Sequence, residues 1–99
     1  MPQTHNFGSG TFTSELWIAG KRVFEDLKSA NVEFLTGGEW DWIIANSVGA
    51  IVKTVRHSGP GGWVSIDLPS LVIYGHHSLG FRSASPGTKK IRAGDLTYG

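Results

Sequence analysis

The chain has 99 residues, of which 39% are hydrophobic and 17% charged, and its formal net charge is +1. This length and composition predict one globular domain and exclude a disordered chain. The sequence contains no cysteine, which excludes disulfides, thiolate metal sites and a cysteine nucleophile. The most apolar stretch, Trp40–Val55, is interrupted by polar residues and is too short to span a bilayer. We therefore expect a soluble cytoplasmic protein without a membrane partner.

The charges are unevenly distributed along the chain. Residues 1–50 contain three basic and six acidic side chains, whereas residues 51–99 contain six basic and two acidic ones, so the halves carry net charges of −3 and +4. Such asymmetry is typical of contact with nucleic acid or of complementary faces that meet in an oligomer. It also arises when the two halves neutralise each other within one fold, and this is the interpretation we prefer.

The first third of the chain predicts an arm, a strand and a helix. Residues 1–10 are polar without periodicity, which indicates a flexible N-terminal arm before a single domain over residues 11–99. Thr11–Ile18 is rich in residues that favour strands, although Ser14 could instead cap a helix that extends to Ala30. Within Lys21–Ala30 the apolar side chains recur at helical spacing, which predicts an amphipathic helix.

The remainder of the chain reads as short strands separated by glycine-rich turns. Because one helix is followed by runs that alternate or are rich in β-branched residues, the pattern predicts an α+β fold. We expect one helix packed on a strongly curved, mostly antiparallel sheet, or a small SH3-like open barrel, of about five to seven short strands. The expected strands are 32–35, 40–45, 48–57, 63–68, 71–74 and 89–92.

The sequence HSGPGG, residues 57–62, is the only glycine cluster that resembles a phosphate-binding or nucleophile loop. It lacks the lysine and the following helix of a phosphate-binding loop, and it does not have the spacing of a dinucleotide site or a nucleophile elbow. Pro60 and Gly61 instead suit the two central positions of a type II turn. We therefore predict a hairpin between 48–57 and 63–68.

Two adjacent histidines, His76 and His77, are the residues best suited to acid–base chemistry near neutral pH. If the protein is an enzyme, a small hydrolase or isomerase would use one of them with Asp67 or Asp41. Adjacent histidines in a strand point to opposite faces, and no metal-ligand spacing is present, so the sequence predicts no metal and no cofactor.

Four tryptophans in a chain of this length indicate that at least one is exposed or at an interface. Trp40 and Trp42 share one face of an expected strand, where they can form a core or a stacking platform for a sugar, a base or a proline. We expect a small soluble, homodimeric binding domain for an unknown small molecule or protein, and the sequence favours a non-catalytic domain over an enzyme. The expected ligand-binding residues are Trp40, Trp42, Trp63, Tyr74 and His76.

The segment from Arg82 to Arg92 contains four basic side chains and no acid, a composition typical of a phosphate-contacting loop. The alternative function is therefore a nucleic-acid-binding small barrel. The residues that would contact nucleic acid are Arg82, Lys89, Lys90 and Arg92.

Overall fold

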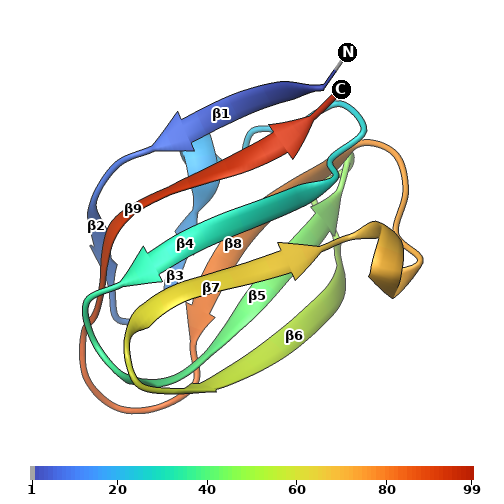
Figure 1. Cartoon of the computed structure of the whole chain (residues 1–99). Helices are drawn as coiled ribbons and strands as arrows, with labels where there is room; N and C mark the ends of the chain where they lie inside the picture. Colours follow the sequence, from blue (N-terminus) through green and yellow to red (C-terminus); the bar gives the residue numbers. More distant parts are fainter. Residues whose placement is uncertain (1) are drawn as a thin grey trace.

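A computed structural model describes residues 2–99, and most of them belong to β-strands (Figure 1). All strand pairs are antiparallel. Two short 3₁₀ turns, η1 (Ile18–Gly20) and η2 (Pro69–Leu71), interrupt the succession of strands. The strands are β1 (Gln3–Phe7), β2 (Gly10–Phe12), β3 (Glu15–Trp17), β4 (Ser29–Phe34), β5 (Gly38–Asn46), β6 (Ile51–Gly59), β7 (Gly62–Asp67), β8 (His77–Ser83) and β9 (Lys89–Tyr98).

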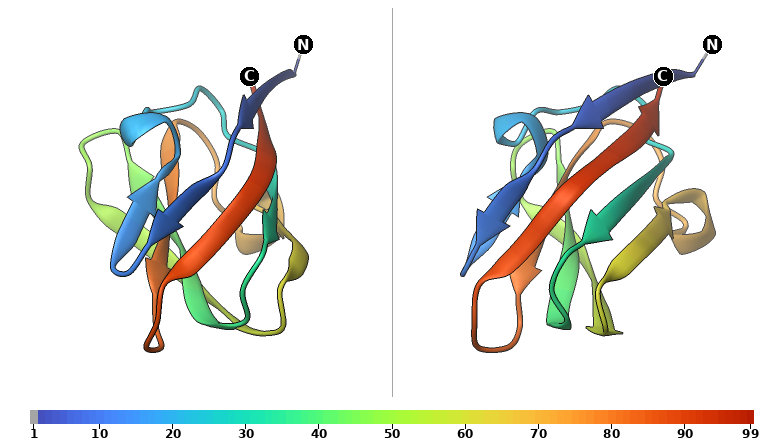
Figure 2. Two further views of the ribbon diagram at one scale, coloured as in Figure 1. Left: turned by 90° about the vertical axis from the view of Figure 1, so that its left-hand side faces the viewer. Right: turned by 60° about the vertical axis from the view of Figure 1, so that its left-hand side comes forward.

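The strands form two sheets packed face to face (Figure 2). Sheet A has the order β1-β9-β4-β7, with β2 also paired to β9, and sheet B has the order β3-β8-β5-β6. β1 and β2 both pair with β9 and together act as one strand that is bent at residues 8–9. With β1 and β2 counted as one, the sandwich has eight strands. Consecutive strands lie in different sheets, except for β5 and β6, which are neighbours in sheet B. This strand order is that of a jelly roll.

The α+β prediction is wrong, because the part of the chain that the structure describes contains no α-helix. Residues 21–28 form an irregular crossover from sheet B to sheet A, and an isolated bridge joins Phe24 to His77. Lys21 and Asp26 have positive φ angles of 70° and 48°, which a right-handed helix does not allow. The apolar residues of the expected stripe are still largely buried, since Phe24 and Leu27 fill the end of the space between the sheets. A segment this short gains too little from local hydrogen bonds to hold a helix against that packing.

The N-terminal residues also differ from expectation. The flexible arm predicted over residues 1–10 is instead largely strand, because Gln3–Phe7 pairs in register with Gly94–Tyr98 of β9; Met1 lies outside the described residues. Thr11–Ile18 contains strands, as we preferred, but a turn at residues 13–14 divides them between the two sheets. The expected strand 71–74 is η2 and a loop, whereas His77–Ser83 is a central strand that the sequence did not indicate.

The glycine cluster is a turn, as predicted, but it does not close a hairpin. β6 pairs with β5 and β7 pairs with β4, so the turn carries the chain from sheet B to sheet A. The positive φ angles fall at Gly59 and Gly62 rather than at Gly61. Gly61 is needed for another reason: a Cβ there would lie 2.7 Å from the carbonyl oxygen of Phe34, which is closer than a carbon atom can approach.

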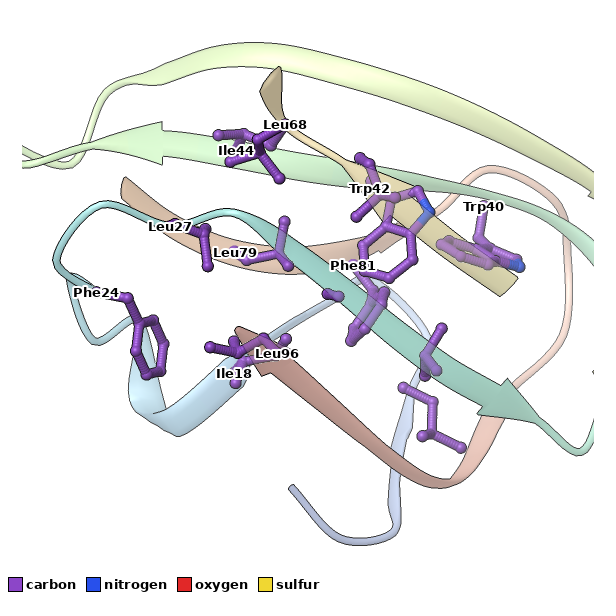
Figure 3. Packing of buried hydrophobic residues seen from close by; sticks show 14 of the residues in the cluster. Ile18, Phe24, Leu27, Trp40, Trp42, Ile44, Leu68, Leu79, Phe81 and Leu96 are labelled. Carbon is purple, nitrogen blue, oxygen red and sulfur yellow. The ribbon is translucent and has the colours of Figure 1, made fainter. Parts of the chain in front are cut away.

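The hydrophobic core lies between the sheets and contains a cluster of aromatic rings around Phe81 (Figure 3). The ring centroid of Phe81 in β8 lies 5.0–6.3 Å from the ring centroids of five other aromatic side chains. Trp40 stacks on Phe34 across the sandwich, with a centroid distance of 4.2 Å and an interplanar angle of 17°. Aromatic pairs in these arrangements stabilise a core beyond the area that they bury. The rings around Phe81 are Phe7, Phe12, Phe34, Trp40 and Trp42.

Candidate functional site

The structure separates the tryptophans expected at a ligand site. Trp40 and Trp42 point inward from β5 and are each only 2% exposed, so they belong to the core and are not available to a ligand. Trp63 of β7 is 57% exposed and lies on the outer face of sheet A. The alternation of β7 explains this, because Val64 and Ile66 take the inward positions on either side of Ser65.

Tyr74 and His76 are exposed but do not share a surface with Trp63. Their loop bonds to the crossover, through Leu27 N–H to the Gly75 carbonyl and the Asp26 N–H to Nδ1 of His76. Asp26 also accepts a hydrogen bond of 2.9 Å from the Lys28 ammonium, and this contact, with smaller contributions from Gly75 and His76, lowers the pKa of Asp26. The crossover joins the far end of β4, whereas Trp63 pairs with Glu33 near its other end.

The candidate acid–base residues lie on different elements of the fold. Nδ1 of His77 contacts the Gly75 carbonyl at 3.2 Å, Asp67 lies on β7 opposite Ser29, and Asp41 is bound to Arg56. Within residues 2–99, no hydrogen bond or ion pair joins either histidine to Asp67 or Asp41. Within the same residues, no group of three or more His, Asp or Glu side chains is placed to hold a metal ion.

The basic segment does not form a free cationic surface. Arg82 donates to Glu15 at 3.1 and 3.2 Å, and Arg92 forms an ion pair with Glu33. Lys89 is buried, and its ammonium donates to the carbonyl oxygens of residues 85, 86 and 87. Of the four side chains, only that of Lys90 is exposed and forms no salt bridge within residues 2–99. The nucleic-acid alternative therefore loses the observation that suggested it.

These contacts explain the uneven charge of the two halves. On the outer face of sheet B, Glu15, Arg82, Asp41 and Arg56 lie opposite one another across all four strands, with alternating sign. Arg56 Nε donates to Asp41 at 2.5 Å, and Asp41 raises the pKa of Arg56. Acids of the first half thus neutralise bases of the second within one fold, as we preferred from the sequence.

The outer face of sheet A is different in character, because its register aligns short polar side chains in rows. One row crosses four strands and contains Thr4, Thr97, Ser29 and Asp67; the next contains Asn6, Asp95, Asn31 and Ser65. In the third, Glu33 lies between Ala93 and Trp63. We call these three rows the polar face.

The polar face is organised by its own hydrogen bonds. Ser65 Oγ donates to Oδ1 of Asn31 at 2.5 Å, and Nδ2 of Asn31 donates to Oδ1 of Asp95 at 2.9 Å. Next to these hydrogen bonds, Arg92 and Glu33 form their ion pair. Exposed Leu35 lies next to Gly61, two residues before Trp63. The result is an indole at the margin of a sheet face that carries fixed donors and acceptors.

A separate hollow of about 180 Å³ lies at the opposite side of the sandwich, between the bend of β1-β2 and η1. None of the residues that the sequence suggested for a site lines it. It is mainly apolar and is large enough for about one ring, since an engineered cavity of about 150 Å³ accepts benzene. Its lining residues are Phe7, Gly8, Ser9, Gly10, Leu16, Trp17, Ile18, Ala19, Phe81 and Ile91.

The fold and the site together define a jelly-roll β-sandwich with a polar, tryptophan-bearing face. Comparisons with protein-family models, curated proteins and solved structures give no match to this chain. No helix among residues 2–99 is long and apolar enough to cross a membrane.

Proposed function

We propose that this protein is a non-catalytic binding domain whose ligand contacts the polar face at Trp63. The observation that carries the proposal is the exposed indole of Trp63 on a strand held by six register pairs with β4. A large aromatic side chain on a rigid element offers contact area at a low cost in conformational entropy, which is why tryptophan is enriched at binding hot spots.

The arrangement of titratable groups supports binding rather than catalysis. General acid–base work needs a base within hydrogen-bond reach of its partner or substrate proton. The candidate acid–base residues lie on three different elements: His76 in a loop, His77 in a strand of sheet B and Asp67 in a strand of sheet A. Within residues 2–99, no hydrogen bond joins one of them to another. The polar face, in contrast, already has its groups in fixed mutual positions.

Replacing Trp63 by alanine is expected to abolish ligand binding without unfolding the domain. A two-dimensional NMR screen of nitrogen-labelled protein can use soluble nucleosides, amino acids, short peptides and small sugars as probes. A bound probe should shift the indole N–H signal of Trp63 and amides of β4 and β7, but not the indole signals of Trp40 and Trp42. Tyr74→Ala is the matched control, because it removes an exposed aromatic from another surface. Shifts confined to the loop at residues 74–77, or retained in Trp63→Ala, would show that the site is elsewhere.

We also propose that the protein forms a homodimer through β6. This strand is nine residues long and lies at the edge of sheet B, so one side of its backbone is free to pair with another strand. Ile51 and Val52 add exposed apolar surface there. A second copy could extend the sheet across a two-fold axis, which is the commonest symmetry of dimers.

Val52→Glu is expected to convert the dimer into a monomer, since it would bury an unpaired charge in the apolar part of the proposed interface. Light scattering at micromolar concentration measures the mass. Val72→Glu serves as the control, because Val72 is exposed in the loop after η2 and not on β6. A monomeric mass for the unmodified protein refutes the proposed dimer.

A cytoplasmic location is also part of the proposal. It rests on the absence of cysteine, which makes the fold independent of the oxidising conditions that disulfide-bonded domains require.

A further inference from the structure

We infer that the ligand of the polar face is a neutral oligosaccharide, with one pyranose ring stacked on Trp63 and the following units over the rows of short polar side chains. This inference rests on the proposed binding function, and it adds the chemical class of the ligand. It follows from three features of the face: its aromatic group, its hydrogen-bonding groups and its charge.

The aromatic feature is a single flat indole beside polar groups. A pyranose has an apolar side formed by its ring C–H groups, and hydroxyls around its rim. An indole can therefore cover the apolar side while the rim remains within reach of polar neighbours. Trp63 has such neighbours in Glu33, directly opposite on β4, and Ser65, two residues along β7 on the same face.

The hydrogen-bonding feature is the ordered row through Asn31. Each member has bonding capacity beyond the bonds it makes within the row. Asn31 has a second N–H, Asp95 has a second carboxylate oxygen, and the Ser65 hydroxyl oxygen can still accept. Planar amide and carboxylate groups that offer both donors and acceptors suit the paired hydroxyls of a sugar. Because their mutual bonds already fix them, little side-chain entropy is lost when a ligand binds.

The dimensions of the face suit an extended ligand. Successive outward residues on one strand are about 6.7 Å apart, and neighbouring strands are about 4.8 Å apart. The three outward positions of β7, namely Trp63, Ser65 and Asp67, thus extend over about 13 Å. With Ser29 and Asn31 alongside on β4, they form a track long enough for several sugar units and not only one.

The charge of the face argues against the other macromolecules. Three acids, Glu33, Asp67 and Asp95, lie on the polar face, and these repel the phosphates of nucleic acids and anionic lipids. Arg92 is engaged with Glu33. The core of a protein interface is depleted in charge and rich in apolar side chains, whereas this face has only Trp63 and neighbouring Leu35 as large exposed apolar groups among the residues described.

The test uses the full chain and a panel of neutral tetrasaccharides: cellotetraose, xylotetraose, mannotetraose, maltotetraose and tetra-N-acetylchitotetraose. Binding is measured by NMR titration at millimolar sugar, and by retardation in native gels that contain the matching polysaccharide. We expect at least one sugar to shift Trp63 together with Asn31 and Ser65. Absence of binding to all five sugars overturns the inference.

Variants of the two features separate a sugar from other ligands. Trp63→Tyr keeps a flat ring and is expected to retain affinity within a few fold, whereas Trp63→Leu keeps apolar area without a ring and is expected to lose at least about ten-fold. Asn31→Ala is expected to weaken sugar binding by several fold. Thr54→Ala is the control, because Thr54 is an exposed polar residue on β6 of sheet B. Equal affinity of the Leu and Tyr variants contradicts stacking on a sugar.

The outcomes also separate this inference from the proposed function. If the sugars fail but a peptide or nucleoside shifts Trp63, the protein is a binding domain for that other class and the sugar inference is wrong. If no probe of any class affects Trp63, the proposed function fails as well. The circular dichroism spectrum and melting temperature of each variant establish that a lost signal does not reflect unfolding.

Discussion

Replacing Trp40 by alanine is expected to lower the free energy of unfolding by about 3–5 kcal/mol. The indole is almost fully buried and stacks on Phe34, and it makes edge contacts with Trp42 and Phe81. Alanine would leave a cavity in the middle of the aromatic core that the two sheets cannot close without moving apart. For a domain of this size the loss corresponds to a fall in melting temperature of about 15–30 °C.

Trp63→Ala is the matched control for that prediction. It removes the same side chain from a strand, but Trp63 is mostly exposed, so the expected loss is within about 1 kcal/mol. Urea unfolding followed by circular dichroism measures both variants. If Trp40→Ala is as stable as Trp63→Ala, Trp40 does not stabilise the core, and the result favours the prediction that it contacts a ligand. The pair therefore distinguishes core from site with one measurement.

The contrast between these two tryptophans shows how far the sequence could be interpreted. Alternation correctly predicts that Trp40 and Trp42 share one face of a strand, but it does not tell which face is buried. Here both faces of β5 are covered, because Ile43 on the opposite face lies across from Gly80. A Cβ at Gly80 would be 2.8 Å from the ring of Trp17, so the Trp17 ring covers the outer face of sheet B at this point. That contact joins residues far apart in the chain.

The expected helix failed for a related physical reason. Val23, Phe24, Leu27 and Ala30 have helical spacing, and a periodic pattern of ten residues agrees equally with a crossover whose apolar groups meet different partners. In the structure Ala30 already belongs to β4, where Ala30, Val32 and Phe34 alternate with three polar residues. The stronger signal was therefore the alternation of polar and apolar residues that begins at residue 29. The predicted helix ended at Ala30 and so included the first two residues of this strand.

The polar face could be recognised only after the strands were in register. Each of Asn31, Ser65 and Asp95 is an ordinary polar position of an alternating strand, and nothing in the local sequence marks it. The rows arise because β9 and β7 flank β4 on its two sides. Of the members of the polar face, the sequence singled out only Trp63 and Asp67, Trp63 through the exposure expected of at least one tryptophan and Asp67 as a candidate acid.

Lys89→Met is expected to destabilise the domain by about 2–3 kcal/mol, because hydrogen bonds that involve a charged group contribute more than those between neutral groups. The Lys89 side chain is 2% exposed. Its ammonium donates to three successive backbone carbonyls of the turn between β8 and β9, at 3.0 Å from Ser85, 3.4 Å from Pro86 and 3.3 Å from Gly87. Methionine has similar length but no donor, so the carbonyls would lose their partner.

Lys90→Met is the natural control, since Lys90 follows directly in the chain and faces solvent. It removes the same charge and is expected to change stability by less than about 0.5 kcal/mol. Thermal unfolding of the two variants distinguishes the roles: Lys89 holds the turn, whereas Lys90 contributes only charge to the surface. Equal stability of both variants would mean that the ammonium of Lys89 does not hold the turn, and that its buried position contributes nothing that methionine cannot replace. A large loss for Lys89→Met alone would explain a lysine in the interior of a sandwich as the residue that holds the turn from β8 in sheet B to β9 in sheet A.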